Sequence, residues 1–263
     1  MRLSLVPTAL LLCVLATGAD TTGAEQPAAG KGPQIVFLVS EDPSNYEATR
    51  TIPVFAKMLQ DRYGCCCKVI QGEGEPNAFR FPGLEAIKKA DLLVVFFRRR
   101  ALSTEQLGMI RQYLASGKPL VGIRTANHAF SVRGKVAPGY EMWWEFVPEV
   151  LGCGNHGYGP EKPGVNVAVP PDAANHPILA GVKLDKWHAE GCLYLVKPID
   201  KKNTVLLTGS VNDKTEPIAW TRNYKQSRVF YTSLGYPTNF DSPDFCKFLA
   251  NGLFWALDKP VPK

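Results

Sequence analysis

Two side chains that could bind or transform a substrate, Arg124 and His128, follow an apolar run in the stretch GKPLVGIRTANHAF, residues 117–130. A guanidinium holds a carboxylate, a phosphate or sugar hydroxyls through its planar fork of donors. An imidazole, with an unperturbed pKa near 6.5, can exchange protons at neutral pH. We predict that Arg124 positions a substrate and that His128 is catalytic, although a buried ion pair and a structural histidine would fit the same two residues.

A second histidine, His156, follows Asn155 in the glycine-rich segment GCGNHGYG. Such loops run over protein surfaces and carry functional side chains more often than cores do. We predict that His156 is catalytic and that Asn155 contacts the substrate. The glycine spacing also matches the dinucleotide fingerprint, but the segment follows an expected helix, WWEFVPEVL, where that motif requires a strand, so no nucleotide cofactor is expected.

Four further substrate contacts are predicted after two other apolar runs. Glu41, Asn45 and Tyr46 follow PQIVFLVS, and Arg99 is the residue chosen from the arginine triplet after DLLVVFF. An amide and a phenol could hydrogen-bond and stack on a sugar ring. A loop packed by its own side chains would use them equally well.

Metal chemistry is an open alternative for the same region. Glu41, His128 and His156 are ligand types that suit a catalytic divalent ion with an open position, so a divalent metal is one candidate cofactor. Their spacing in the sequence does not require a metal. The sequence contains no P-loop, no G-x-S-x-G elbow and no H-E-x-x-H helix, which disfavours the common nucleotide, esterase and zinc protease classes.

The elements that must position these residues alternate between strand and helix in the first half of the chain. Near-continuous apolar runs predict buried parallel strands at residues 33–40, 65–70, 91–97 and 119–123. Helical periodicity indicates helices at 51–63 and 103–117, the second capped by Ser103. The pattern predicts a doubly wound, mostly parallel α/β sheet with helices on both faces, in which ligands bind at the carboxyl ends of the strands.

The second half predicts further strands and one closing helix. The strands are expected at residues 164–169, 191–196, 204–209, 216–221 and 228–234, and the helix at 243–257. With 263 residues, of which 45% are hydrophobic, the chain can bury one large core. We therefore predict a single domain over residues 33–263.

The first residues resemble a secretory signal peptide, because Arg2 precedes the apolar run LSLVPTALLLCVLATG and small residues follow it. The prediction is a signal peptide over residues 1–24, cleaved after Ala19 or Ala24, and a disordered linker over 25–32. No later run is long enough to span a bilayer, so the protein is expected to be exported to the periplasm or the extracellular space. Its 30 basic and 24 acidic residues are spread along the chain, which does not favour a nucleic acid partner.

Several segments resemble the ThuA-like family, which is related in fold to class I glutamine amidotransferases. They are SEDPSNYEATRTIPVFA, KPLVGIRTANHAF, EVLGCGNHGYG, NHPILAGV and EPIAWTRNYKQSRVFYTSLGYP, and the resemblance extends over residues 34–262. It implies a flavodoxin-like, amidotransferase-like α/β fold. It also implies a carbohydrate ligand, because ThuA-like proteins are linked to the use of trehalose and related sugars.

The sequence departs from the pattern of its relatives at several positions, four of which bear on catalysis. Arg124 stands where amidotransferases carry the nucleophilic cysteine, and Tyr236 stands where ThuA-like proteins commonly have a histidine, so glutaminase activity is not expected. In the glycine-rich segment His156 is kept, while Tyr158 and Gly159 replace histidines. A role that needs two adjacent histidines is therefore not supported.

The cysteines allow two interpretations, a zinc site or a disulfide. Cys153 with His156, and His188 with Cys192, form pairs that could bind zinc. Both cysteines replace the small residues that the resemblance leads us to expect, and an exported protein meets an oxidising environment. We therefore favour a disulfide between Cys153 and Cys192 over a zinc site.

Two functions remain open at this point. The first is an enzyme that hydrolyses or isomerises a carbohydrate or keto-sugar derivative by acid and base chemistry of histidines. The second is a binding protein for a sugar or an anion that uses the same pocket without turnover. A scaffold domain would show a large exposed apolar patch instead of a polar pocket.

Overall fold

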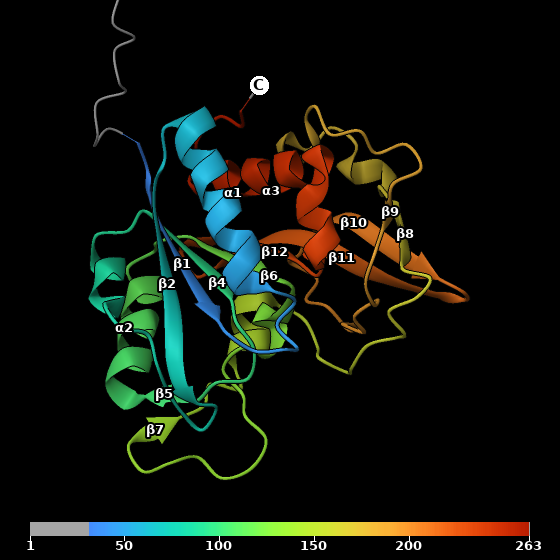
Figure 1. Cartoon of the computed structure of the whole chain (residues 1–263). Helices are drawn as coiled ribbons and strands as arrows, with labels where there is room; N and C mark the ends of the chain where they lie inside the picture. Colours follow the sequence, from blue (N-terminus) through green and yellow to red (C-terminus); the bar gives the residue numbers. More distant parts are fainter. Residues whose placement is uncertain (1–31, 263) are drawn as a thin grey trace, which may run out of the picture.

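The computed structural model describes residues 32–262, which form one twelve-stranded sheet with helices packed against it (Figure 1). The predicted signal peptide and residues 25–31 of the predicted linker lie outside the described residues. Within residues 32–262, no helix combines the length and the apolar character that crossing a membrane requires.

The centre of the sheet is parallel, as the buried apolar runs predict. Five strands run side by side in the order β2, β1, β4, β6, β12. Every residue of β4 and β6 is buried, because helices cover both faces of these strands. The bounds of these five strands are Gln34–Ser40 (β1), Cys66–Glu75 (β2), Leu92–Phe96 (β4), Leu120–Ile123 (β6) and Ser227–Thr232 (β12).

Alternate residues of β1 belong to two different hydrophobic cores. Phe37 lies in the core that contains α1 (Ala48–Tyr63) and α3 (Pro243–Ala256), whereas Leu38 lies in the core that contains α2 (Thr104–Ala115). Figure 1 shows α1 and α3 on one side of the sheet and α2 on the other. The three-layer arrangement that the sequence predicts is therefore present.

The prediction of a mostly parallel sheet is wrong, because the sheet is mixed. Only five of the eleven strand pairings are parallel. The second half of the chain folds back through two-residue loops at 212–213 and 225–226, and such loops join only antiparallel neighbours. The remaining strands are Ala78–Arg80 (β3), Leu102–Ser103 (β5), Tyr140–Glu141 (β7), Val165–Ala168 (β8), His188–Ala189 (β9), Thr204–Val211 (β10) and Lys214–Tyr224 (β11).

Two local predictions also fail. Residues 191–196 form no regular strand, because their backbone bonds only irregularly to the glycine-rich segment, with a single bridge between Tyr158 and Tyr194. The expected helix WWEFVPEVL shortens to one π-helical turn, Phe146–Leu151. The other short helices are Leu84–Lys88, Arg124–His128, Pro171–Ala173, Pro177–Leu179 and Pro237–Asp241.

Left-handed backbone gathers at the carboxyl ends of the central strands. Tyr46, Arg99 and Arg124 follow β1, β4 and β6 and have φ angles of 52°, 48° and 43°. Non-glycine residues rarely adopt this conformation, and such strain concentrates at functional sites.

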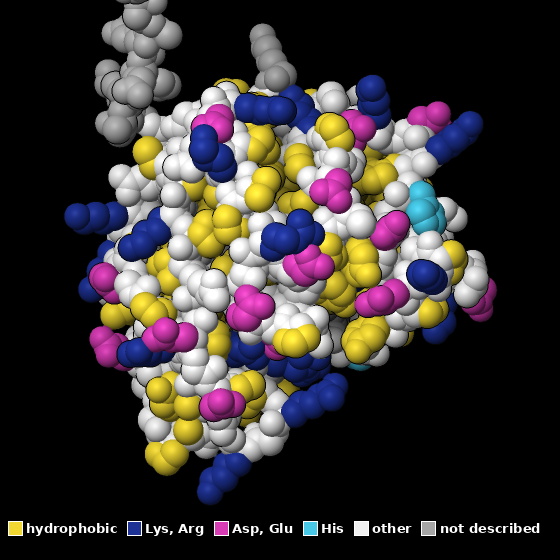
Figure 2. Space-filling view, viewed as in Figure 1, with side chains coloured by type: hydrophobic (Ala, Val, Ile, Leu, Met, Phe, Trp, Pro, Cys, Tyr) yellow, Lys and Arg dark blue, Asp and Glu magenta, His cyan; other side chains and the backbone are white. Residues whose placement is uncertain are grey.

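Figure 2 shows basic and acidic side chains interspersed over most of one face, with a group of Lys and Arg below its centre, near the end of β1 in Figure 1.

Candidate functional site

A cavity of about 310 Å³ opens at this carboxyl edge of the sheet. We call it the cationic cavity, because two arginines and no acidic residue line it. The lining comes from the segments that follow β4 and β6, from both sides of the π-helical turn and from residues 191–196. The fold therefore brings together residues that are far apart in the sequence. The lining residues are Arg99, His128, Ser131, Arg133, Trp144, Asn155, Gly157, Tyr158 and Tyr194.

The two arginines of the cationic cavity have no acidic partner. Neither Arg99 nor Arg133 forms an ion pair with a carboxylate of residues 32–262, and the buried Nε of Arg99 has no hydrogen-bond acceptor. The neighbours of Arg99 differ, since Arg98 and Arg100 both pair with Asp42, at 3.8 Å and 3.1 Å. Burial, followed by the charges of Arg133 and Arg98, lowers the pKa of Arg99. An anion in this cavity would relieve that repulsion.

His128 is held as a neutral imidazole. Its Nδ1 lies 2.5 Å from Oδ1 of Asn127, and because an amide oxygen only accepts, Nδ1 carries the hydrogen and Nε2 is left as an acceptor. Burial is the main cause that lowers the pKa of His128 to about 3, followed by the nearby guanidinium groups. At neutral pH the ring can accept a proton or a hydrogen bond but carries no charge.

Exposed aromatic rings flank the same cavity. Trp144 is 56% exposed and Tyr158 is 61% exposed, and only Val54 shares this degree of exposure among the large hydrophobic side chains of residues 32–262. Tyr158 packs at 6.1 Å from the buried ring of Tyr194, which itself lies 6.0 Å from the ring of His128. Aromatic rings in such positions offer flat apolar faces with polar edges, which suit a sugar ring.

Arg124 does not line the cationic cavity, although its side chain is buried at the same edge. Its guanidinium carbon lies 4.0, 4.9 and 5.6 Å from the ring centres of Tyr46, Tyr194 and Tyr236. Burial raises the pKa of Tyr46 and Tyr194, so these neutral rings meet the cation through their faces. Its Nη1 also donates to the carbonyl of Ser233 at 2.8 Å. The buried ion pair that was the alternative interpretation of Arg124 is absent within residues 32–262.

Glu41 and Asn45 do not line the cationic cavity either. Asn45 is fully buried and donates to the carbonyls of Ser40 and Phe96, while its Oδ1 accepts from Thr125. It therefore fastens together the segments that follow β1, β4 and β6. Glu41 is exposed and accepts a hydrogen bond from a threonine of α1 at 2.6 Å.

Of the two predicted site residues in the glycine-rich segment, only one lines the cationic cavity. Asn155 lines the cavity and donates from Nδ2 to the carbonyl of Asn127, 3.1 Å away. His156 is exposed, and its ring lies over Gly154, where Nε2 comes within 2.3 Å of the position that an added Cβ would occupy. His156 and His128 therefore do not share the cationic cavity.

The metal and disulfide hypotheses find no support in the geometry. Among residues 32–262, no three His, Cys, Asp or Glu side chains come close enough to hold a metal ion, so Glu41, His128 and His156 do not assemble. The favoured disulfide is wrong, because Cys153 and Cys192 are both free thiols. The sulfur of Cys192 instead lies 3.4 Å from a nitrogen of the buried Arg124 guanidinium.

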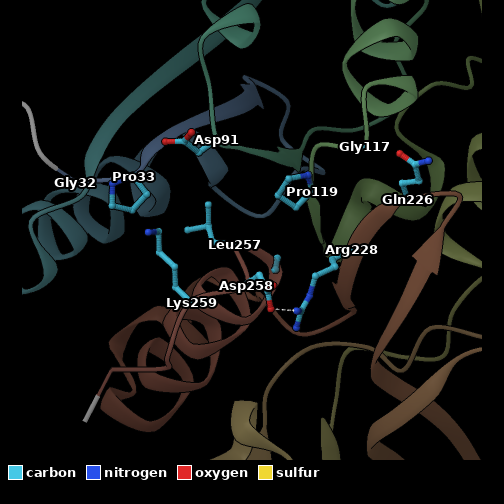
Figure 3. A pocket seen from close by; sticks show the side chains of 11 residues that line it. Gly32, Pro33, Asp91, Gly117, Pro119, Gln226, Arg228, Leu257, Asp258 and Lys259 are labelled. Atoms are coloured by element: carbon cyan, nitrogen blue, oxygen red, sulfur yellow. Dashed lines mark hydrogen bonds and ion pairs between the residues drawn. The ribbon is translucent and has the colours of Figure 1, made fainter.

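A second large pocket, of about 400 Å³, lies at the opposite edge of the sheet (Figure 3). Pro33, Asp91 and Pro119 line it just before β1, β4 and β6, and the side chain of Arg228 pairs there with Asp258. None of the predicted site residues reaches this pocket. Ligands of open parallel sheets bind at the carboxyl edge, so we place the site at the cationic cavity.

Several lining residues were not among the predicted contacts. Ser131, Arg133 and Tyr194 carry no local pattern that sets them apart, because they lie in irregular segments whose path only the fold determines. Tyr158 stood out only as a departure from the histidines of related sequences. The adjacent tryptophans of EMWWEF gave one signal, because side chains of neighbouring residues point in different directions, but this signal does not say which of the two rings is exposed.

Comparisons with known proteins agree with this fold. A sequence profile described as ThuA, trehalose utilisation, matches residues 36–256. Crystal structures of ThuA-like proteins from Bacteroides uniformis and Parabacteroides merdae superpose with TM-scores of 0.64 and 0.61, at 19% and 18% identity. The superpositions cover 88% and 89% of this chain and 95% and 93% of those proteins.

A carbohydrate deacetylase, Agd3, is a more distant structural relative. Its TM-score is 0.51 at 14% identity, over 86% of this chain and 33% of the deacetylase. Similarity at such low identity establishes the fold alone. Among curated proteins, none is significantly similar to this sequence.

Proposed function

Because the chain belongs to the ThuA family, we propose that it is an exported protein that acts on a carbohydrate or keto-sugar derivative bound in the cationic cavity. The family description, trehalose utilisation, supports a carbohydrate ligand. The export part of the proposal rests on the apolar N-terminal run.

The lining of the cationic cavity is the observation that carries this proposal. Trp144 and Tyr158 present exposed rings at the same cavity that contains a neutral imidazole and two arginines without an acidic partner among the described residues. Rings that pack on a sugar, with a few polar groups that fix its orientation, are the usual composition of a small-molecule site. The cavity also lies where the fold class binds ligands.

Of the two expected reaction types, isomerisation fits the lining better than hydrolysis. Glycoside hydrolysis most commonly uses a pair of carboxyl groups, and no acidic residue lines the cavity. Proton removal from a carbon next to a carbonyl needs one acceptor and a cation near the oxygen that becomes negative. His128 would take the proton, which leaves an enediolate whose negative oxygen Arg99 stabilises. The proton then returns to the same carbon, which gives an epimer, or to the former carbonyl carbon, in which case the hydroxyl proton passes between the two oxygens of the enediolate.

Proton exchange in D₂O tests this reaction directly. A 3-keto disaccharide, with trehalose as the carbonyl-free control, is followed by NMR with the mature protein. We expect deuterium to enter only the keto-sugar, and the rate to fall at least about 100-fold in His128→Gln. His156→Gln, whose imidazole lies outside the cavity, should keep the wild-type rate. Undiminished exchange in His128→Gln would refute the assignment of the base.

A binding protein without turnover is the second candidate, and the low pKa of His128 favours it. A general base works best when its pKa lies near the working pH, and a pKa of about 3 is far from neutrality. This alternative predicts broadened sugar resonances without deuterium exchange. The same NMR experiment therefore separates the two functions.

A further inference from the structure

A second cavity, of about 250 Å³, adjoins the cationic cavity. The two cavities share four lining residues, so they lie next to each other at the same edge of the sheet. The shared residues are His128, Ser131, Trp144 and Asn155. Typical ligand pockets measure about 300–1,000 Å³. Each cavity alone lies at or below the lower end of that range, whereas the pair lies within it.

The lining of the second cavity is mainly apolar, and we call it the apolar cavity. Phe130, Trp143, Val147 and Pro148 form most of its unshared lining, and no charged side chain contributes to it. Trp143 packs at 5.8 Å from the ring of Phe130 and at 5.3 Å from that of Phe146, so the wall is a fixed part of the core. A preformed apolar wall favours an apolar ligand group that loses its water on binding.

The two cavities therefore differ in the chemistry they accept. The cationic cavity holds Arg99 and Arg133, which have no carboxylate partner in the part of the chain that the structure describes, and the guanidinium fork of an arginine matches a planar anionic group. The apolar cavity offers aromatic and aliphatic surface. His128 and Asn155 lie between them, where a sugar joined to an apolar group would pass.

We propose that the ligand is a glycoside with two unlike parts: an acidic sugar, bearing a carboxylate or a phosphate, in the cationic cavity, and an apolar aglycone in the apolar cavity. This inference rests on the proposed carbohydrate function and narrows it to a substrate class. A neutral disaccharide would place hydroxyls against the wall of Phe130 and Val147 and would leave Arg133 without an anion, although Arg99 could still meet the oxygen of a keto group.

Calorimetric titration of the wild-type protein with four glycosides tests the inference without any variant. The set is methyl glucoside, phenyl glucoside, methyl glucuronide and phenyl glucuronide, which separates the charge from the aglycone. We expect phenyl glucuronide to bind tightest, and the loss of either part to weaken binding about tenfold, the equivalent of about 1.4 kcal/mol. Phenyl glucoside 6-phosphate, compared with phenyl glucuronide, shows which anion the site prefers.

Arg133→Gln gives an independent measurement on an exposed side chain. This variant should lose the preference for glucuronides over glucosides and keep the preference for phenyl over methyl. Arg62→Gln removes the same charge near the C-terminal end of α1, at the opposite edge of the sheet, and should change neither preference.

The outcomes separate this inference from the proposed function. If methyl glucoside binds as tightly as phenyl glucuronide, the two-part ligand is refuted while the carbohydrate function stands. Equal affinity of glucosides and glucuronides, or an equal effect of Arg133→Gln and Arg62→Gln, overturns the anionic part. If no glycoside binds, the two-part ligand is refuted, while deuterium exchange into the keto-sugar still decides the proposed function.

Discussion

The neutral imidazole of His128 predicts how stability changes with pH. In the unfolded chain a histidine has a pKa of about 6.5, whereas the folded protein lowers the pKa of His128 to about 3. Below pH 6.5 the His128 imidazole is therefore protonated in the unfolded chain but stays neutral in the folded protein. The free energy of unfolding consequently falls as the pH falls toward 3. Burial is the first cause, and the charges that add to it belong to Arg99, Arg98, Arg124 and Arg133.

The size of the effect follows from the linkage between proton binding and folding. With these two pKa values, the free energy of unfolding decreases by about 2 kcal/mol between pH 7 and pH 5 through His128 alone. Burial, with a smaller contribution from Arg228, also lowers the pKa of His176, and that histidine adds a loss in the same direction. A difference between wild type and His128→Gln removes the contribution of His176.

Urea denaturation at pH 7 and pH 5 measures this difference. The loss of stability between the two pH values should be about 2 kcal/mol smaller in His128→Gln than in the wild type. His156→Gln, in which an exposed ring is removed, should lose as much stability as the wild type. If His128→Gln keeps the full pH dependence, the imidazole is charged in the folded protein and our account of the cavity is wrong.

Three further substitutions, one of them with a matched control, test the packing of the core and of the site by thermal or urea unfolding. Gly252→Ala in α3 would place a Cβ 2.2 Å from a phenyl ring of β12 and should cost about 1–3 kcal/mol. Its matched control, Gly108→Ala in α2, meets nothing within 4 Å and should gain up to about 1 kcal/mol, so equal effects of the two would contradict the structure. Asn45→Ala removes four buried hydrogen bonds and should cost about 3 kcal/mol, and a near-neutral result would show that the amide does not join the strands. Gly191→Ala would place a Cβ 2.8 Å from the Arg124 guanidinium at a φ of 98° and should cost about 2 kcal/mol, whereas an unchanged stability would show that this contact is loose.

The sequence predicts the centre of the fold well, because burial on both faces leaves a continuous apolar run. The strands β1, β4 and β6 and the three long helices lie within a few residues of their expected bounds. The location of the ligand edge follows from this alternation. Ser103 caps α2 as predicted, by accepting a hydrogen bond from the amide of Gln106.

The remaining errors have a common physical cause, which is that apolar runs report burial and not hydrogen-bond partners. Residues 191–196 are buried at most positions, yet their carbonyls bond to an irregular loop. The same limit applies to side chains that share a type. Nothing local distinguishes Trp143, which is 6% exposed, from Trp144, which is 56% exposed. Similarly, Arg124 is buried under tyrosines contributed by segments that only the completed fold brings together.

The pairing of β6 with β12 has a consequence for the order in which the molecule forms. Arg124, just after β6, is held by the carbonyl of Ser233, which lies 109 positions later in the chain. Until β12 has been synthesised, one long edge of β6 has no partner strand, and unpaired edges invite association between chains. Contacts of such long range form slowly. The ligand edge is therefore among the last parts of the protein to form. A chain truncated before Ser227 would leave an edge of β6 unpaired and would tend to aggregate instead of folding into a smaller functional domain.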